Sequence, residues 1–444
     1  MKRFFLLNSP IFWDSTSEQE QYLPPIGLGY IATHLEKAGI ETTIIDCVRA
    51  NKSVKDIITQ LQLESPEYIG INIFTQNYDI VKHIIEEINF SCTCFIGGQV
   101  VKSIYKDILN WNSDNRINII IGEGEFIIPA IVLGECKEEP EIHNQNKFVY
   151  RVNKDSVYFP NDISNIALNR EFLDNEIIVN HYGEKEAAII TSRGCMYNCA
   201  FCGGARSLNP DIPIRMRSEK SIITEIVDII QLYPDVSSIR ILDDLFLRNS
   251  RSVEMAYRIF HEFPQLSWRG MVHVLSLIND LGKADELPNS RCKELFIGIE
   301  SGSERIRRHI NKRGSIDDIL KVAYAILKNN IDLKGYFIYG FPNETEADFQ
   351  ETYDLAVRIK EISLKTKGKF RTSVFQFRPY HGTQLYYEIM EKEGILHSCE
   401  FNPSISLFEG RSQFNFSFGN YSSASDDVLN DYIIKTQKIG ELDV

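Results

Sequence analysis

The sequence predicts an α/β protein: an N-terminal Rossmann-like doubly wound parallel sheet, followed by a partial (β/α)6 barrel and a short C-terminal cap. Two observations predict this fold. Apolar strands alternate with amphipathic helices through the first 134 residues, and after an irregular stretch the alternation resumes near residue 186. Alternation of this kind is typical of parallel sheets whose strands are connected by helices. A chain of 444 residues is long enough for two or three domains.

We expect four regions: a first domain at 1–134, a linker at 135–180, a barrel at 181–394 and a segment at 395–444 that covers the substrate. Strands of the first domain are expected at residues 4–8, 41–46, 68–73, 92–96 and 118–121. Its helices are expected from Pro24 and Pro25 to Gly39, and at residues 54–63, 78–89 and 126–133. The linker is expected to hold a hairpin around residues 148–158 and to wrap the second domain.

The second domain supplies the strands of the predicted barrel. They are expected at residues 187–191, 238–242, 267–273, 294–299, 334–339 and 372–377. Helices are expected at residues 219–232, 253–260, 316–329, 346–361 and, in the tail, 426–437. Catalytic groups of βα barrels lie at the carboxyl ends of the strands. Polar residues that end these strands are therefore candidate site residues.

Glycines follow two strands of the first domain, Gly97 and Gly98 after one, Gly122 and Gly124 after another. Ligands of doubly wound sheets bind at the carboxyl ends of the strands, and glycine lets a ligand approach the backbone closely. Neither glycine pair forms a G-x-G-x-x-G fingerprint or a P-loop. The pattern predicts a ligand site at this sheet edge without naming the ligand.

Three cysteines, Cys195, Cys199 and Cys202, follow the first barrel strand at a C-x3-C-x2-C spacing. Three thiolates in one loop can bind three corners of an iron–sulfur cube. The next cysteine is Cys292, so one iron keeps an open position for a substrate or cofactor. A structural zinc site needs four ligands and an electron-transfer cluster a fourth cysteine, while a purely buried cysteine cluster is the remaining alternative.

Carboxylates end two barrel strands. Asp243 and Asp244 end the second strand, where they can bind a metal, act as acid and base, or cap the next helix. Glu300 and Ser303 follow the fourth strand. These two can bind ribose hydroxyls or an α-amino group, and Ser303 can equally be a helix N-cap.

Two further features accompany these strand ends. Gly340 ends the fifth strand and begins a turn with Pro342. Arg217 lies with Arg215 ahead of the first long barrel helix. In the site, these arginines can pair with a carboxylate or with the negative surroundings of the iron–sulfur cluster. Alternatively, they form exposed ion pairs.

The cysteine loop, with Phe201 before its third cysteine, resembles the signature of the radical S-adenosylmethionine (SAM) enzymes. The resemblance implies a [4Fe-4S] cluster whose open iron binds the amino and carboxylate groups of SAM. One-electron reduction then cleaves SAM to methionine and a 5′-deoxyadenosyl radical. It further implies that Asp243 and Asp244 recognise the SAM amino group, that Glu300 and Ser303 bind SAM, and that adenine lies near Gly340.

The first domain resembles the cobalamin-binding module that precedes many radical SAM domains. The resemblance rests on Leu-Pro-Pro-Ile-Gly-Leu-Gly-Tyr-Ile-Ala from Leu23, Phe-Ile-Gly-Gly ending at Gly98, and Ile-Gly-Glu-Gly-Glu ending at Glu125. It implies cobalamin as a third cofactor. One departure from mutase-type modules matters: none of the nine histidines has an aspartate two residues before it, so the axial histidine motif is missing. The alternative is a domain that only shapes the substrate cavity.

Composition and charge exclude some function classes. The net charge of −13 argues against a broad nucleic-acid or anionic-membrane surface. No apolar run approaches the length of a membrane span, and the N-terminal run at residues 4–7 is too short for a signal peptide. Cysteines without a secretory signal fit a reducing cytoplasm. We therefore expect a cytoplasmic protein with a small-molecule or peptide substrate and a flavodoxin- or ferredoxin-type reductant.

The function expected is hydrogen abstraction from an unactivated carbon of a small metabolite or peptide, with cobalamin-dependent methyl transfer as the leading outcome. A cobalamin-independent epimerase, dehydratase or rearrangement enzyme is the alternative, and Cys399 is the candidate hydrogen donor for it. A non-enzymatic cluster or cobalamin sensor is a further alternative. Methylthiolation of RNA is disfavoured because Cys47, Cys92 and Cys94 lack a cluster spacing and the tail is not basic.

Overall fold

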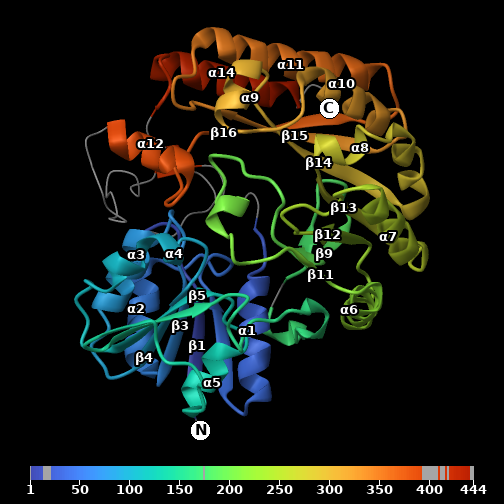
Figure 1. Ribbon diagram of the computed structural model, residues 1–444. Coiled ribbons are helices and arrows are strands. Elements are labelled where there is room, and N and C mark those ends of the chain that lie inside the picture. The colour runs from blue at the N-terminus through green and yellow to red at the C-terminus, as the bar shows by residue number, and fades with distance from the viewer. Residues whose placement is uncertain are drawn as a thin grey trace.

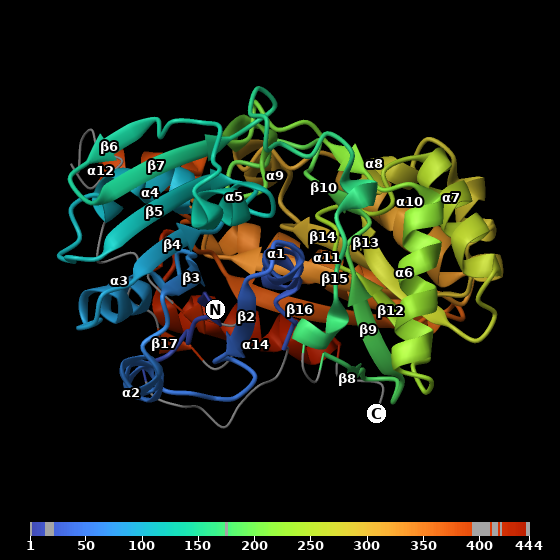
Figure 2. The ribbon, with the colours of Figure 1, turned by 90° about the horizontal axis from the view of Figure 1, so that it is seen from below.

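The computed structural model describes residues 2–13, 22–173, 176–392 and 420–440, with the backbone of 409–410 and 416–417. It has two α/β lobes (Figure 1), and helix α1 lies between their two sheets (Figure 2). The α/β class and the two parallel sheets predicted from the sequence are confirmed.

The first lobe is a doubly wound sheet with the strand order β2-β1-β3-β4-β5-β7-β6. Its strands are β1 Arg3–Asn8, β2 Glu41–Asp46, β3 Tyr68–Asn72, β4 Thr93–Gly97, β5 Arg116–Gly122, β6 Ile142–Asn144 and β7 Lys147–Val152. Its helices are α1 Ile26–Lys37, α2 Val54–Glu64, α3 Tyr78–Glu86, α4 Val101–Ile108 and α5 Ile127–Leu133. Apolar side chains of α2, α3 and α4 cover one face, and those of α1 and α5 cover the other.

Two features of this lobe differ from the expectation. Strand β7 pairs in parallel with β5 and in a hairpin with β6, so the first sheet extends beyond residue 134 into the expected linker. Helix α4 was not expected after Gly98, although Val101, Ile104 and Ile108 follow helical spacing and are buried. The rest of the linker, with the short 3-10 helices at Ile163–Asn165 and Arg170–Phe172, packs between α1 and the second sheet.

The second lobe is a curled sheet of six parallel strands in the order β16-β15-β14-β13-β12-β9, with the short antiparallel β8 at its edge. The strands are β8 Ile178–Val179, β9 Lys185–Ile189, β12 Ser238–Ile241, β13 Ser267–Val272, β14 Cys292–Glu300, β15 Asp332–Tyr339 and β16 Phe370–Gln376. The helices are α6 Glu219–Leu232, α7 Ser250–His261, α8 Val274–Leu277, α9 Glu304–His309, α10 Ile316–Leu327, α11 Glu346–Leu364, α12 Gln384–Lys392 and α14 Asp426–Ile439. The predicted six-stranded partial barrel is confirmed.

Most barrel helices lie outside the sheet, and one apolar cluster joins α6, α7, α8, α10, α11 and α14 to it. Helices α9 and α12 instead pack in a separate cluster with Ala200 of the cysteine loop. The tail helix α14 packs on α11 and β16. Within the described residues, none of the helices combines the length and the apolar character that crossing a bilayer requires.

Candidate active site

The three cysteines lie in a loop at the carboxyl end of β9 that other segments hold in place. Strand β10, Ser192–Arg193, pairs with β11, Arg215–Met216. The Ala200 N–H donates to the Ile310 carbonyl at 2.9 Å, and the Ala200 carbonyl accepts from the Leu385 N–H at 3.0 Å. The loop is therefore fixed at both its base and its tip, as a set of metal ligands requires.

The thiols are half-buried and form no disulfide. Burial raises the pKa of Cys202 to about 12 and raises those of Cys195 and Cys199, while Lys312 works against this shift at both of the latter. Among the described residues, no three Cys, His, Asp or Glu side chains converge on one metal ion. The thiolates of a cubane bind different irons, so three thiols beside a cation fit the predicted cluster.

The two aspartates after β12 have different surroundings. Asp243 is buried and accepts hydrogen bonds from the Thr191 N–H at 2.7 Å, the Thr191 hydroxyl at 2.6 Å, and the backbone and hydroxyl of Ser192. Its carboxylate ties the end of β12 to the start of the cysteine loop, which makes it a positioning residue. Asp244 instead faces a cavity beside Gly204 and Cys195. Of the predicted pair, Asp244 is the one placed to meet a ligand.

Glu300 and Ser303, which we expected to bind the same ligand, have different partners in the structure. Glu300 has a φ of 65° at a break in the β14–β15 register and pairs with Lys312 at 3.0 Å, next to Cys199. Ser303 is buried and its hydroxyl donates to Asp348 at 2.6 Å. That bond connects α9 to α11, so Ser303 is engaged within the fold, whereas Glu300 stays near the cysteines.

The expectation for Arg217 needs a correction, because it is neither free in the site nor an exposed ion pair. Its nitrogens donate to Ser221, to the Ile190 carbonyl and to the buried Glu225 carboxylate. Glu225 also pairs with Arg170 at 2.5 Å. Arg217 thus belongs to a buried network between α6 and the interdomain segment.

Arg248, which the sequence did not single out, lies closer to the cysteines. It is 9% exposed, and its Nη2 donates to the Ser192 hydroxyl. Its Nε and Nη1 are buried without a hydrogen-bond partner in the part of the chain that the structure describes. Buried donors of this kind almost always have partners, so these two can receive the carboxylate of a bound ligand.

Gly340 begins a turn that Glu344 holds. The Glu344 Oε2 accepts from the N–H groups of Gly340 at 2.7 Å and Phe341 at 2.9 Å. Gly340 has a φ of +93°, which favours glycine. Phe341 packs edge-on against Phe201 of the cysteine loop, so this turn borders the loop.

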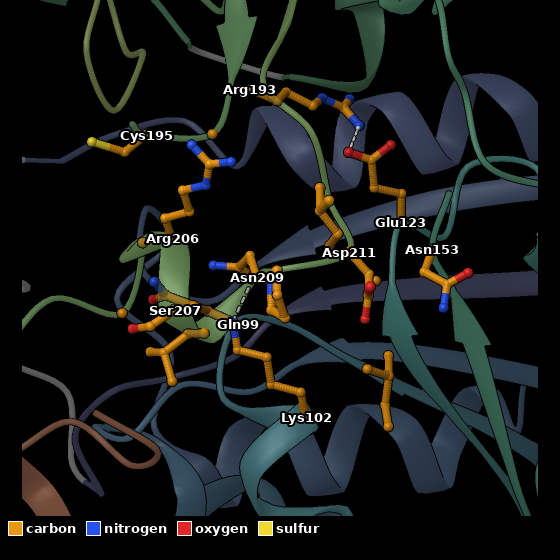
Figure 3. Close-up of a pocket in the computed structure, with 18 of the residues that line it drawn as sticks. Gln99, Lys102, Glu123, Asn153, Arg193, Cys195, Arg206, Ser207, Asn209 and Asp211 are labelled. Atoms are coloured by element: carbon orange, nitrogen blue, oxygen red, sulfur yellow. Dashed lines mark hydrogen bonds and ion pairs between the residues drawn. The ribbon is translucent and has the colours of Figure 1, made fainter. Parts of the chain in front are cut away.

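A cavity of about 910 Å³ separates the first sheet from the cysteine loop (Figure 3). Gly98, Gln99 and Gly122 line it from the carboxyl ends of β4 and β5, and Cys195 and Asp244 line it from the barrel. Its volume is near the upper end of the usual range for ligand pockets, about 300–1,000 Å³. The predicted glycine edge and the cysteine loop therefore face each other across one cavity.

The cavity walls also carry polar side chains from both lobes: Lys102, Ser103, Asn153, Arg206, Ser207 and Asn209. Lys102 donates to Asn209 at 2.5 Å across the cavity. A macrocycle rimmed with amide groups, such as cobalamin, fits this size and this set of donors and acceptors. Among the described residues that line the cavity, none is a histidine.

The four glycines that were predicted to form the ligand site do not all line the cavity. Gly98 and Gly122 line the cavity, whereas Gly97 and Gly124 do not. A Cβ on Gly124 would approach the Ile128 side chain to 2.7 Å, so packing explains this glycine. Cys399, the predicted hydrogen donor, lies outside the described residues.

Two family models match the chain. Residues 189–356 match the model described as the radical SAM superfamily, and residues 16–132 match the B12 binding domain. Among curated proteins, the uncharacterized methyltransferase PH0819 of Pyrococcus horikoshii is 26% identical over 82% of this chain and 78% of its own length. The cytidylyl-2-hydroxyethylphosphonate methyltransferase of Streptomyces wedmorensis is 22% identical over 83% of this chain and 78% of its own length.

Solved structures share the fold. The radical SAM methyltransferase TsrM from Kitasatospora setae, solved with tryptophan substrate and a SAM analog, aligns with a TM-score of 0.64 at 15% identity, covering 91% of this chain and 80% of TsrM. The cobalamin-dependent SAM radical enzyme OxsB aligns with a TM-score of 0.64 at 15% identity, covering 95% of this chain and 65% of OxsB. The two family models match in this order, so the chain carries a B12-binding domain followed by a radical SAM domain.

Proposed function

We propose that this chain is a cobalamin-dependent radical SAM methyltransferase that acts on a small metabolite or peptide. The observation that carries the proposal is the shared cavity, in which Gly98 and Gly122 of the B12-binding domain face Cys195 and Asp244. A methyl carrier must lie close to the cluster side of the barrel, and this cavity supplies that adjacency. The methyltransferase names of PH0819, the cytidylyl-2-hydroxyethylphosphonate enzyme and TsrM support the same reaction class.

The residues take the following roles in the proposal. Cys195, Cys199 and Cys202 would hold three irons of a [4Fe-4S] cluster, which would supply the electron for SAM cleavage, and cobalamin would carry the methyl group. Asp244 accepts from the SAM amino group, and Arg248 pairs with the SAM carboxylate through its unpartnered Nε and Nη1. Glu300 with Lys312 bounds the site beside Cys199. The turn at Gly340 borders the cysteine loop on the side of Phe201.

The remaining parts of the proposal concern the cellular setting. We also propose a cytoplasmic location, a flavodoxin- or ferredoxin-type reductant and a substrate other than nucleic acid, which the acidic composition and the cysteine pattern support. The tRNA-modifying relatives match shorter parts of this chain, for example 30% and 14% of it.

The test is anaerobic reconstitution with iron and sulfide, with and without cobalamin. We expect a cluster spectrum, retained cobalamin absorbance after desalting, and 5′-deoxyadenosine or S-adenosylhomocysteine from SAM after reduction. The Cys199→Ala variant is expected to lose iron and SAM cleavage, whereas the matched Cys136→Ala variant, changed in a cysteine far from the loop in sequence, is expected to keep both. SAM cleavage without retained cobalamin would support the cobalamin-independent alternative, and a well-formed cluster that never cleaves SAM would support the sensor.

A further inference from the structure

A second, smaller cavity of about 290 Å³ lies inside the barrel. Arg240 of β12, Tyr336 of β15 and Phe375 of β16 line it from the sheet, and Phe201 lines it from the cysteine loop. Leu23 of the first lobe contributes to its wall as well. The cavity therefore borders the reaction centre, is built by both lobes, and is distinct from the large interdomain cavity, with which it shares no lining residue.

Arg240 has no carboxylate partner in this cavity. Its Nε is buried without a hydrogen-bond partner, and no ion pair of Arg240 is found in the described part of the chain. Its guanidinium carbon lies 5.6 Å from the ring centre of Phe296. Buried charges in proteins are normally paired, because removing an ion from water is costly.

The carboxylates nearby are already taken by other cations. Glu186 accepts from Arg269 at 2.5 and 2.7 Å. Glu294 pairs with Arg269 at 2.9 Å and accepts from Arg371 at 2.8 Å. Glu186 and Glu294 therefore favour the charge of Arg240 only from a distance, and within the described residues neither forms an ion pair with it.

Lys334 adds a second basic side chain to the barrel interior, where burial lowers its pKa to about 7. It is 5% exposed and lies two residues before Tyr336, hence on the same face of β15. Its ammonium contacts the rings of Tyr336 at 5.1 Å and Phe296 at 6.0 Å, and no ion pair of Lys334 is found among the described residues. The Arg240 guanidinium inside aromatic walls, with a basic side chain beside the Tyr336 ring, forms a receptor for an anion attached to an organic skeleton.

We propose that the substrate carries an oxyanion, a carboxylate or a phosphate, which Arg240 binds inside the barrel while Tyr336 and Phe375 contact the attached carbon skeleton. The proposal rests on the methyltransferase function proposed above, because it names the substrate class of that reaction. The rings of Tyr336 and Phe375 stack at 6.0 Å and 29°, which provides a continuous apolar wall beside the anion site.

The test is a titration of the anaerobically purified full-length chain with inorganic phosphate and, separately, acetate, at ionic strength held constant with chloride. We expect one of these ions to raise the melting temperature of the wild-type chain, and the more effective ion identifies the anion class. In Arg240→Gln the dissociation constant is expected to rise at least about 30-fold, the effect of removing a buried charge partner. Arg240→Lys is expected to recover part of the affinity.

Arg258→Gln is the matched control, since Arg258 lies on the surface and pairs with Glu219. It is expected to keep the wild-type response. Without oxyanion, Arg240→Gln is expected to melt at the same temperature as wild type or higher, because it removes an unpaired buried charge. A lower melting temperature would make Arg240 a structural residue, and an unchanged oxyanion response, or none in wild type, would overturn the proposal.

Failure of this proposal is separable from failure of the methyltransferase function. The titration needs neither SAM nor cobalamin. Cleavage of SAM without substrate is measured in parallel in wild type and in Arg258→Gln, in which the changed side chain lies on the surface. Loss of SAM cleavage in wild type would count against the enzyme, whereas loss of the oxyanion effect alone would count only against the substrate class.

Discussion

Two arginines near the cysteine loop differ in what their nitrogens already bind. Arg217 donates to Ser221, Ile190 and Glu225 and completes a buried network. Arg248 retains two buried donors without a described partner. An arginine that is fully bonded stabilises the fold, and one with unmet donors can bind a ligand.

The first prediction separates these roles. Arg248→Gln is expected to raise the KM for SAM about 10-fold or more, because a charge-assisted pair with the SAM carboxylate is lost, while the melting temperature changes little. Arg217→Gln is expected to destabilise the fold by about 3–5 kcal/mol, because Glu225 loses a buried partner. Both variants are measured by SAM-dependent kinetics and by denaturant unfolding. If the two variants changed the KM for SAM and the unfolding free energy alike, Arg248 would not be the ligand-binding arginine.

Glu344 is a buried carboxyl with one unsatisfied oxygen. Its Oε2 accepts from two backbone N–H groups, and its Oε1 is buried without a hydrogen-bond partner within the described ranges. Burial raises the pKa of Glu344 to about 8, against the two backbone hydrogen bonds, which lower it. Between pH 4.5, the ordinary pKa of this carboxyl group, and pH about 8, Glu344 therefore stays protonated in the folded protein, whereas the unfolded chain releases the proton.

The second prediction is a pH dependence. Because the pKa of Glu344 is raised on folding, its contribution to stability is complete below pH 4.5 and is lost as the pH rises toward 8. The free energy of unfolding of wild type relative to Glu344→Gln is expected to fall by up to about 1.4 kcal/mol per pH unit across this window. Urea unfolding of both proteins at several pH values measures the difference, and parallel curves would show that Glu344 does not titrate there.

At the scale of elements, the β4–α4 turn depends on a glycine for a backbone reason. Gly98 has a φ of +120°, and a Cβ there would lie 2.4 Å from the Ile73 carbonyl oxygen. The turn brings the end of β4 against the end of β3, since the Ile73 N–H donates to the Gly97 carbonyl at 2.7 Å. The same turn presents Gln99 to Gly203 of the cysteine loop.

The third prediction tests this turn. Gly98→Ala is expected to cost at least about 1–3 kcal/mol of stability, because the backbone must leave its conformation or strain the contact with Ile73. Gly27→Ala, in the first turn of α1 with nothing near its Cβ position, is the control and is expected to be neutral or stabilising. Thermal unfolding of both variants measures the contrast, and equal melting temperatures would remove the backbone argument.

At the scale of the whole molecule, an ion network connects the two lobes. Glu123, next to Gly122 of the first lobe, pairs with Arg215 at 2.5 Å and Arg193 at 3.1 Å of the second. Arg193 also pairs with Glu125 at 2.7 Å. Burial raises the pKa of Glu123, but the two guanidinium groups outweigh it and hold this pKa below its ordinary value.

The fourth prediction concerns the joint between the lobes. Glu123→Gln is expected to cost about 3–5 kcal/mol, the effect of breaking a buried pair, and to separate unfolding into two transitions. Because the pKa of Glu123 is lowered on folding, the contribution of the pair is present above pH 4.5 and is lost as the pH falls through the lower folded value. Calorimetry measures both effects, with Glu219→Gln as the control, since the partner of Glu219 is the exposed Arg258. The control is expected to lose less than about 1 kcal/mol of unfolding free energy.

The sequence by itself determined the order of the elements and the position of the cysteine loop. Helix α6 and strand β2 lie where their spacing placed them, and the six barrel strands follow in the expected order. Periodicity, caps and cysteine spacing are local features, so neighbouring residues suffice to predict them. Helix α4 follows the same rule, since Val101, Ile104 and Ile108 carry the apolar spacing of a helix.

Only the tertiary structure decided which polar residues are available to a ligand. Asp243 is occupied by residues about fifty positions away, Ser303 by Asp348, and Arg217 by Glu225. Arg240 and Arg248, which have the same chemistry, keep unmet donors because the described part of the fold brings no acceptor within hydrogen-bond distance of these nitrogens. The physical reason is that a hydrogen-bond partner is set by distance in space, and two parallel sheets bring together residues that the sequence keeps far apart.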